Sequence, residues 1–217
     1  MFYDTARNNH GLRHNPLKAL VAPRPIGWIS TLDVNGVANL APYSFFNLVS
    51  DRPPCVMFSG GGPKDSWLNA KATAEFVCSL ATWDLRYEMN ASSAEVAPEV
   101  DEFTIARVTP APSRFVKPPR VKESPVALEC KLVQTVALPK HAESGKIHTL
   151  VIGEVVGVYI DDRFVKNGLV DTGAMRPIAR MGYRDYSVVG SEQVFTLELP
   201  ELDAGGRVIG PWGPSER

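Results

Sequence analysis

The stretch RPIGWISTLDVNGVANLAPYS, residues 24–44, decides the fold of this chain. An apolar run ends at Ser30 and Thr31, and a second run suited to a strand begins at Val37. Between the two runs lies Asn35–Gly36, and an Asn-Gly pair is favoured in tight hairpin turns because both residues accept positive φ. The stretch therefore predicts a β-hairpin that turns at Asn35–Gly36.

Two short strands and two helices are predicted next, because short apolar runs alternate with runs of helix-forming residues. The predicted strands are CVMFS (55–59) and EFVCSLA (75–81), and the predicted helices are KDSWLNAKATA (64–74) and WDLRYEMNASSAE (83–95). Either Asp65 or Ser66 is expected to cap the first helix with its side chain.

The second half of the chain adds a long pair of strands. The segments VALECKLVQTVAL (126–138) and IHTLVIGEVVGVYI (147–160) are apolar and rich in β-branched residues, and a short polar link separates them, so they are expected to pair. The proline-rich residues 108–125 predict an extended connector, and residues 175–200 an irregular tail. Together the strands favour a mainly β, antiparallel barrel with a few outer helices, because a closed barrel has no exposed edge.

The composition excludes several classes of protein. The 217 residues are 44% hydrophobic, enough for one sizeable core, and a net charge of −1 lacks the basic excess of a nucleic-acid-binding protein. Cys55, Cys78 and Cys130 form no C-x-x-C pair, and His10 and His14 lack a third ligand, so no metal site is expected. There is no signal sequence and no run long enough for a membrane span. These features indicate a cytoplasmic protein without nucleic-acid or membrane partners.

No catalytic motif stands out in the sequence. The turn SGGGPKDS (59–66) lacks the glycine directly before Lys64 and the hydroxyl directly after it that a nucleotide-binding P-loop needs. There is no G-x-S-x-G elbow, and nothing marks a paired-carboxylate hydrolase. The turn still offers a generic anion site, made of backbone N–H groups, Lys64, and Ser66 at a helix start. The alternative is a surface turn with a solvated lysine.

Three further features each have two interpretations. Ser30 and Thr31 end a strand before a turn, where their hydroxyls bind a phosphate or only satisfy the turn. Phe45 and Phe46 are adjacent, so in an extended segment at most one enters a given core and the other meets a ligand or a partner subunit. His148 lies among apolar alternate positions, where it is a core residue or a donor to a ligand.

Taken together, the motifs resemble a known family. The block RPIGWISTLDVNGVANLAPYSFFNLVSDRPPCVMFS (24–59), followed by KDSWLNAKATAEFVCSL (64–80), resembles the flavin reductase-like, FMN-binding split-barrel proteins. The similarity is to the branch of flavoredoxin-like and flavoprotein oxygenase-associated proteins. The later segments IHTLVIGEVV (147–156) and RPIARMGYRDY (176–186) fall where that family has its own later signatures.

The resemblance implies a fold and a domain organisation. Residues 20–190 would form one FMN-binding split β-barrel, a mainly β, Greek-key antiparallel barrel with a few flanking helices. Residues 1–19 would be an N-terminal segment, and residues 191–217 a C-terminal extension. The resemblance also implies a homodimer with FMN near the subunit interface, and FAD is an alternative flavin.

The resemblance carries over site residues as well. The flavin itself would carry the chemistry, so no side chain is implied as a catalytic acid or base, and His148 would lie near the nicotinamide. Residues 44–47 would run along the flavin ring, whereas Lys64 and its neighbours would hold the phosphate. The full implied set is Ser30, Thr31, Ser44, Phe45, Phe46, Asn47, Ser59, Lys64, Asp65, Ser66, Arg180 and Tyr183.

The implied activity is that of an NAD(P)H:flavin oxidoreductase. Hydride would pass from NAD(P)H to the flavin, and reduced flavin would serve a partner oxygenase. The alternative is a flavoredoxin-like carrier, which holds FMN tightly and takes electrons from a partner protein. A third hypothesis is a β-barrel without enzymatic function, whose glycine turn is only a turn. An oxidase of pyridoxamine phosphate would need more cations in the early strands than this chain has.

Overall fold

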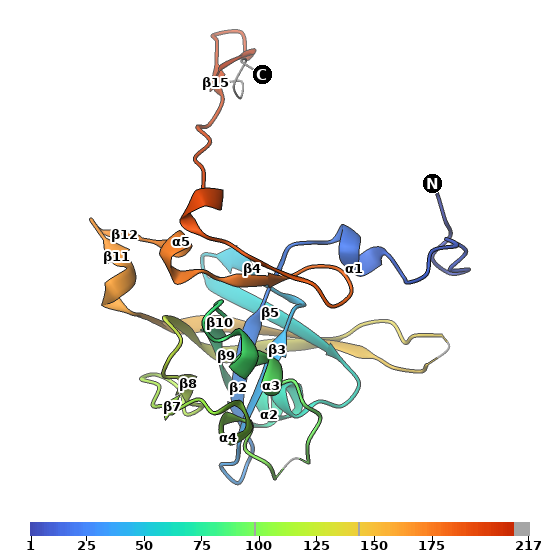
Figure 1. Cartoon of the computed structure of the whole chain (residues 1–217), viewed down its shortest axis with the longest axis vertical. Helices are drawn as coiled ribbons and strands as arrows, with labels where there is room; N and C mark the ends of the chain where they lie inside the picture. The colour runs from blue at the N-terminus through green and yellow to red at the C-terminus, as the bar shows by residue number, and fades with distance from the viewer. Residues whose placement is uncertain (98, 143, 211–217) are drawn as a thin grey trace.

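The fold is built on one antiparallel sheet of seven strands. The computed structural model of the chain describes residues 1–97, 99–142 and 144–210 (Figure 1). In spatial order the strands are β3 (Ala38–Tyr43), β2 (Gly27–Leu32), β6 (Glu75–Leu80), β9 (Val126–Ala137), β10 (His148–Ile160), β5 (Pro54–Gly61) and β4 (Phe46–Asp51). Every neighbouring pair runs antiparallel, so the predicted mainly β, antiparallel fold is confirmed.

The predicted first hairpin joins β2 to β3, but its turn differs from the prediction. The loop runs from Asp33 to Val37 and is longer than a two-residue Asn-Gly turn. The Asp33 carboxylate accepts hydrogen bonds from the N–H groups of Asn35 (2.8 Å) and Val37 (2.7 Å). Gly36 has φ +88°, whereas Asn35 is not in the positive region. The Asp33 side chain therefore sets this loop, and the Asn-Gly signal overstated how tight it is.

The predicted long hairpin of β9 and β10 joins the two halves of the sheet. β9 pairs with β6 on one side, and β10 pairs with β5 on the other. The register between β9 and β10 shifts after Ile152 and after Val155, and such bulges increase the local bend and twist. At the corner where β3 passes into β4, the Ser59 N–H of β5 donates to the Phe45 carbonyl at 2.9 Å. The seven strands thus curve around a common interior.

The tail forms a second sheet, so the prediction of an irregular tail is wrong. β13 (Ile178–Arg180) pairs with β1 (Arg24–Pro25) on one side and with β14 (Tyr186–Val188) on the other. The remaining short strands are β7 (Pro110–Ala111), β8 (Arg120–Val121), β11 (Val165–Lys166), β12 (Leu169–Val170), β15 (Glu201–Leu202) and β16 (Val208–Gly210). β13 and β14 are only three residues long, and β13 is completed by β1 from a distant part of the chain, so local propensity missed them.

The helices are α1 (Leu17–Leu20), α2 (Asp65–Thr73), α3 (Arg86–Ala91), α4 (Glu102–Ala106), α5 (Thr172–Met175) and the 3-10 helices η1 (Asp162–Phe164) and η2 (Ser191–Gln193). Helices α2, α3 and α4 lie together at one side of the sheet, whereas α1 and α5 lie at the other (Figure 1). The predicted cap of α2 is wrong: its N-cap is Lys64, without a side-chain bond, and the Ser66 hydroxyl donates to Asn39 instead. α3 is shorter than the predicted helix over residues 83–95. Within the described residues, none of these helices has the length and apolar character of a membrane span.

Two hydrophobic clusters pack on the two faces of β2. Trp28 and Ile29 are consecutive and both fully buried. Trp28 packs in one cluster with Phe103 of α4, whereas Ile29 packs in the other with Phe58 and Phe76. Because successive strand residues point to opposite faces, β2 is covered on both sides. The cluster around Trp28 fixes α3 and α4 against the sheet.

Gly153 of β10 lies where the ring of Phe76 crosses the strand. An alanine Cβ at this position would lie 2.3 Å from the ring and 3.2 Å from the Lys131 carbonyl oxygen. Gly153→Ala is therefore expected to lower the free energy of unfolding by about 1–3 kcal/mol through overpacking. Urea denaturation followed by circular dichroism measures the change. Gly210→Ala is the control, because its Cβ meets nothing within 4 Å, and equal losses in both variants would contradict the prediction.

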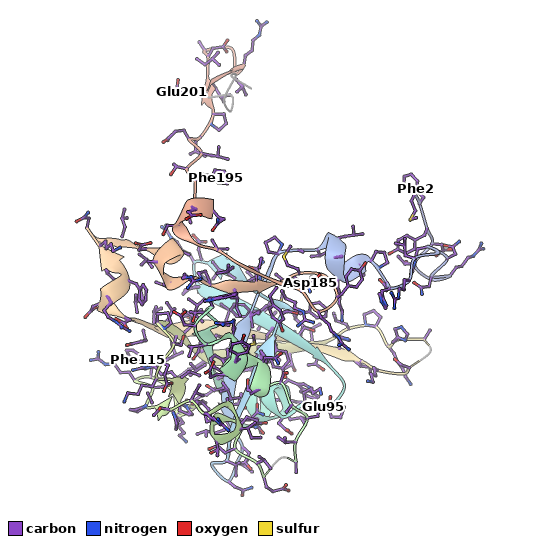
Figure 2. All side chains as sticks on the ribbon, viewed as in Figure 1. Phe2, Glu95, Phe115, Asp185, Phe195 and Glu201 are labelled. Atoms are coloured by element: carbon purple, nitrogen blue, oxygen red, sulfur yellow. The ribbon has the colours of Figure 1, made fainter. Side chains whose placement is uncertain are left out.

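The described part of the C-terminal extension runs away from the body of the protein. After η2 the chain leads outward to the small hairpin of β15 and β16, and Figure 2 labels Phe195 and Glu201 along this arm. Phe195 is 78% exposed. The arm therefore adds nothing to the core described above.

Candidate functional site

Three adjoining hollows form one trench along α3. The polar hollow, about 310 Å³, is lined by Asn39, Tyr43, Lys64, Ser66, Ser93, Glu102 and their neighbours. The bridging hollow, about 140 Å³, includes Ile26, Ser44 and Arg180. The apolar hollow, about 470 Å³, includes Trp83, Arg86, Tyr87, Ile178 and Val188. Pro42 and Ser93 line both the polar and the bridging hollow, whereas Met89, Asn90 and Tyr186 line both the bridging and the apolar hollow.

Asn39 of β3 is the centre of a hydrogen-bond network at the polar hollow. Its Nδ2 donates to Glu102 Oε1 at 2.8 Å, and its Oδ1 accepts from the hydroxyls of Ser66 (2.8 Å) and Thr31 (3.4 Å). Asn69 of α2 in turn donates to Thr31 Oγ1 at 3.2 Å. All of these residues except Asn69 are buried. The network ties β2, β3, α2 and α4 together, so the polar side chains are held in place before any ligand arrives.

Glu102 brings a carboxylate into this network from α4. Its Oε2 accepts the N–H of Leu40 at 3.2 Å, while its Oε1 accepts the Asn39 amide. Burial raises the pKa of Glu102 above its ordinary value, and its hydrogen bonds, including those from Leu40 and Asn39, act in the opposite direction. Both oxygens are already engaged. Glu102 therefore orients Asn39 and is poorly placed to act as a base.

Tyr43 forms the inner wall of the polar hollow. Its ring packs on Phe58 with 4.9 Å between centroids. Burial, as the main cause, raises the pKa of Tyr43 to about 12. The phenol therefore stays protonated near neutral pH and presents a hydroxyl, not a negative charge, to the hollow.

Lys64 stands at the rim of the polar hollow, directly before α2. Its Nζ lies 2.8 Å from Oε1 of Glu95, and this contact lowers the pKa of Glu95. The Glu95 side chain is 87% exposed, and exposed ion pairs contribute little to stability. Lys64 can therefore exchange Glu95 for another anion at small cost. Lys64 is a donor of the kind that binds a phosphate, whereas the hydroxyls of Ser66 and Ser93 beside it already donate to Asn39 Oδ1 and to the Asn90 carbonyl.

Glycines 60–62 make room for two rings and for a turn. A Cβ at Gly60 would lie 2.9 Å from the ring of Tyr43, and a Cβ at Gly61 would lie 2.7 Å from Nε2 of His148. Gly62 has φ +75°, and its N–H donates at 3.0 Å to the carbonyl just before β10. That N–H is already engaged, so the interpretation of this turn as a set of free backbone donors is wrong at Gly62. The glycines serve the site by letting Tyr43 approach.

The two phenylalanines after β3 have different surroundings, as expected for adjacent residues. Phe46 packs on the cluster around Phe58, so closely that a Cβ at Gly27 would lie 2.5 Å from its ring. Phe45 lies 5.9 Å from the ring of His148, centroid to centroid. The close approaches at Gly60 and Gly61 put Tyr43 and His148 on opposite faces of β5. Phe45 and His148 therefore lie together outside the trench.

Stacked cations and rings form the outer end of the apolar hollow. The Arg86 guanidinium carbon lies 4.0 Å from the ring centroid of Trp83 and 4.3 Å from that of Tyr87. Arg176 also approaches Trp83, at 5.4 Å. Such cation–π contacts hold the rings and arginines in fixed positions. The result is a flat apolar surface with positive charge at its edge.

Arg180 supplies a cation to the bridging hollow. It donates to the hydroxyl of Tyr186 and, at 2.7 Å, to the carbonyl of Tyr183. Within the described residues it has no carboxylate partner. Its charge is therefore available to a polar ligand atom beside Ser44, which lines the same hollow.

The structure brings together part of the set that the sequence analysis proposed. The residues of that set that line the trench are Ser44, Lys64, Asp65, Ser66 and Arg180. Thr31 reaches it only through Asn39, whereas the hydroxyl of Ser30 donates to the Pro119 carbonyl at 2.5 Å and faces away. The residues that do not line it are Phe45, Phe46, Asn47, Ser59, Tyr183 and His148. Ser59 is buried, and its Oγ has no partner among the described residues.

Other trench residues were missed by the sequence analysis. They include Asn39, Tyr43, Trp83, Ser93, Glu102 and Tyr186. Asn39 and Tyr43 could have been found from the sequence, because alternate residues of a strand share a face. In the structure, Asn39, Ala41 and Tyr43 of β3 all line the polar hollow. No local signal marks Glu102, whose place depends on how α4 packs.

Comparison with known proteins shows the family and supports the fold. A family model described as "Flavin reductase like domain" matches residues 20–179. An uncharacterized protein of Aquifex aeolicus is 39% identical over 173 residues, which are 77% of this chain and 85% of the relative.

Two solved structures are similar to this chain over most of its length. Nitrilotriacetate monooxygenase component B from Bacillus cereus superposes with a TM-score of 0.82 and 27% identity, over 91% of this chain and 98% of the other. Flavoredoxin of Desulfovibrio vulgaris (Miyazaki F) has a TM-score of 0.71 and 21% identity, over 91% and 98% of the two chains, which is a likeness of fold. The expectation of a split-barrel fold is thereby confirmed.

Proposed function

Because the chain belongs to the flavin reductase-like family, we propose that it binds FMN along the trench. The observation that carries this proposal is the order in which charged, polar and apolar side chains follow one another along the trench. At one end stand Lys64, Ser66 and Ser93, and at the other a hollow walled by Trp83 and Tyr87. FMN has the same order, from a dianionic phosphate through a polar chain to a ring that is apolar on its faces.

The charges of the trench are compatible with an anionic ligand, although carboxylates also line the polar hollow. Glu102 is engaged by Asn39 and Leu40, and Glu95 is paired with Lys64 at the exposed rim. The third carboxylate of this hollow, Asp65, lies in the first turn of α2, where the helix dipole favours a negative charge. In the bridging hollow, Arg180 and Ser44 would meet the polar edge of the flavin ring. The residues present therefore fit FMN at both of its ends.

We propose that NAD(P)H reduces this flavin, so that the protein acts as an NAD(P)H-dependent flavin reductase. Bound flavin would supply the hydride acceptor, and the protein would contribute binding, orientation and electrostatics. Lys64 would anchor the phosphate, and the exposed Ser93 hydroxyl would turn from the Asn90 carbonyl to donate to it. Arg86, at the edge of the apolar hollow, would attract an anionic dinucleotide. His148 and Phe45, outside the trench, stay candidates for contacts with the nicotinamide or with a partner subunit.

The proposal includes a homodimer in the cytoplasm and a partner that uses reduced flavin. The Bacillus cereus protein is named as component B of a monooxygenase, which supports an oxygenase as that partner. The alternative is a flavoredoxin-like carrier with permanently bound FMN.

Anaerobic titration tests the proposal. Protein loaded with FMN is mixed with NADH or NADPH, and the absorbance of oxidised flavin is followed. Bleaching by either nucleotide, much faster than that of free FMN, is expected. Binding of FMN without bleaching by either nucleotide would favour the electron carrier, and the absence of FMN binding would overturn the proposal altogether.

A further inference from the structure

A fourth hollow, here named the outer groove, lies on the other side of Pro63 from the polar hollow. It measures about 510 Å³ and is lined by Pro63, Trp67, Lys146, Ile147, Thr149 and neighbouring residues. Pro63 lines both the outer groove and the polar hollow. The two hollows are therefore neighbours across a single residue, and Lys64 follows that residue directly.

Trp67 gives the outer groove a fixed aromatic wall. Its indole Nε1 donates to the Gly62 carbonyl at 2.9 Å, and its ring packs against the buried cluster around Phe58. Ile147 adds an apolar contact from the end of the β9–β10 hairpin. A flat heteroaromatic ring gains stacking and burial on such a wall.

The boundary between the two hollows attracts negative charge. The Glu95 carboxylate, labelled in Figure 2, lies 2.8 Å from Lys64 Nζ, and Lys146 is close enough to lower the pKa of Glu95 further. Lys64 therefore contacts this anionic group directly, and Lys146 of the groove lining adds positive charge beside it. Because the Glu95 side chain is 87% exposed, a ligand anion can replace it.

We propose that the outer groove binds the adenosine of a flavin dinucleotide, with its second phosphate between Lys64 and Lys146 in place of the Glu95 carboxylate. This inference rests on the proposed function, which puts the flavin phosphate at Lys64. In FAD the second phosphate is joined directly to the first, so it falls at the boundary beside Pro63. The adenine then lies against Trp67. The site is therefore built for FAD as well as for FMN.

Flavin titrations of a few variants test the inference. The dissociation constants of FMN and FAD are measured by quenching of flavin fluorescence. Lys146→Ala is expected to weaken FAD binding about five- to tenfold relative to FMN, because only FAD has a second phosphate. Trp67→Leu is expected to lower the ratio of FAD affinity to FMN affinity. Trp67→Phe keeps a flat ring, so its ratio should stay close to that of the wild type. Lys140→Ala, on the same hairpin but outside the groove lining, is the control and should leave the ratio unchanged.

The outcomes separate this inference from the proposed function. Normal FMN binding with an unchanged ratio of FAD to FMN affinity in Lys146→Ala would overturn the outer groove alone. Failure of the wild-type protein to bind either flavin would overturn both. The adenosine could instead belong to the nicotinamide nucleotide, so the KM for NADH is measured with FMN-loaded protein. A raised KM in Lys146→Ala, with an unchanged flavin ratio, would overturn the assignment to the flavin.

Discussion

Lys64→Ala is expected to weaken FMN binding about 10- to 100-fold, while riboflavin binding stays within about twofold of the wild type. A hydrogen bond from a charged donor is worth about 1.5–3 kcal/mol, and each 1.4 kcal/mol is about tenfold in affinity. The variant also leaves the Glu95 carboxylate unpaired at the rim, where it would repel an approaching phosphate. Riboflavin lacks the phosphate and feels neither effect. Titrations with both flavins, followed by fluorescence quenching, measure the difference.

Lys71→Ala is the matched control for this prediction. Lys71 is exposed in the last turn of the same helix, and it does not line the polar hollow. Its removal should leave the affinities of both flavins unchanged. If Lys64→Ala weakened riboflavin as much as FMN, the lysine would support the fold of the site and not the phosphate.

Glu102→Ala is expected to lower the free energy of unfolding by about 2–6 kcal/mol, because it leaves two buried donors unpaired at a cost of about 1–3 kcal/mol each. These donors are the Asn39 amide and the Leu40 N–H. Without Glu102, the Asn39 amide is free to turn away from the hydroxyl of Ser66, so FMN affinity should fall as well. Urea denaturation and flavin titration measure the two effects.

Two further variants make the Glu102 result specific. Glu102→Gln keeps an acceptor for one of the two donors and is expected to recover about half of the lost stability. Glu99→Ala removes an exposed carboxylate near α4 and should change the free energy of unfolding by less than about 0.5 kcal/mol. A loss from Glu102→Ala no greater than that from Glu99→Ala would show that the carboxylate does not support the network.

Sequence pattern alone predicted the candidate site only where its residues share one local segment, whereas Ser44 and Arg180 were predicted from the family resemblance. The run from Lys64 to Ser66 stands at a helix start in the sequence and lines the polar hollow in the structure. The expectation for the two phenylalanines also followed from strand alternation alone. The cap of α2, in contrast, was wrong because the Ser66 hydroxyl found a better-placed acceptor, Asn39, on another strand.

The sequence by itself determined the strand pattern, the two main hairpins and the position of the lysine turn, because these depend on alternation and turn chemistry within a few residues. The tertiary structure decided which polar groups meet. Glu102 reaches Asn39 from 63 residues away, and Ser30 turns its hydroxyl to a carbonyl 89 residues away. The pairing of β13 with β1 is likewise a contact between distant segments. Such partners are set by how the helices and the tail pack over the sheet, since buried polar groups take whichever hydrogen-bond partner the packing brings within reach.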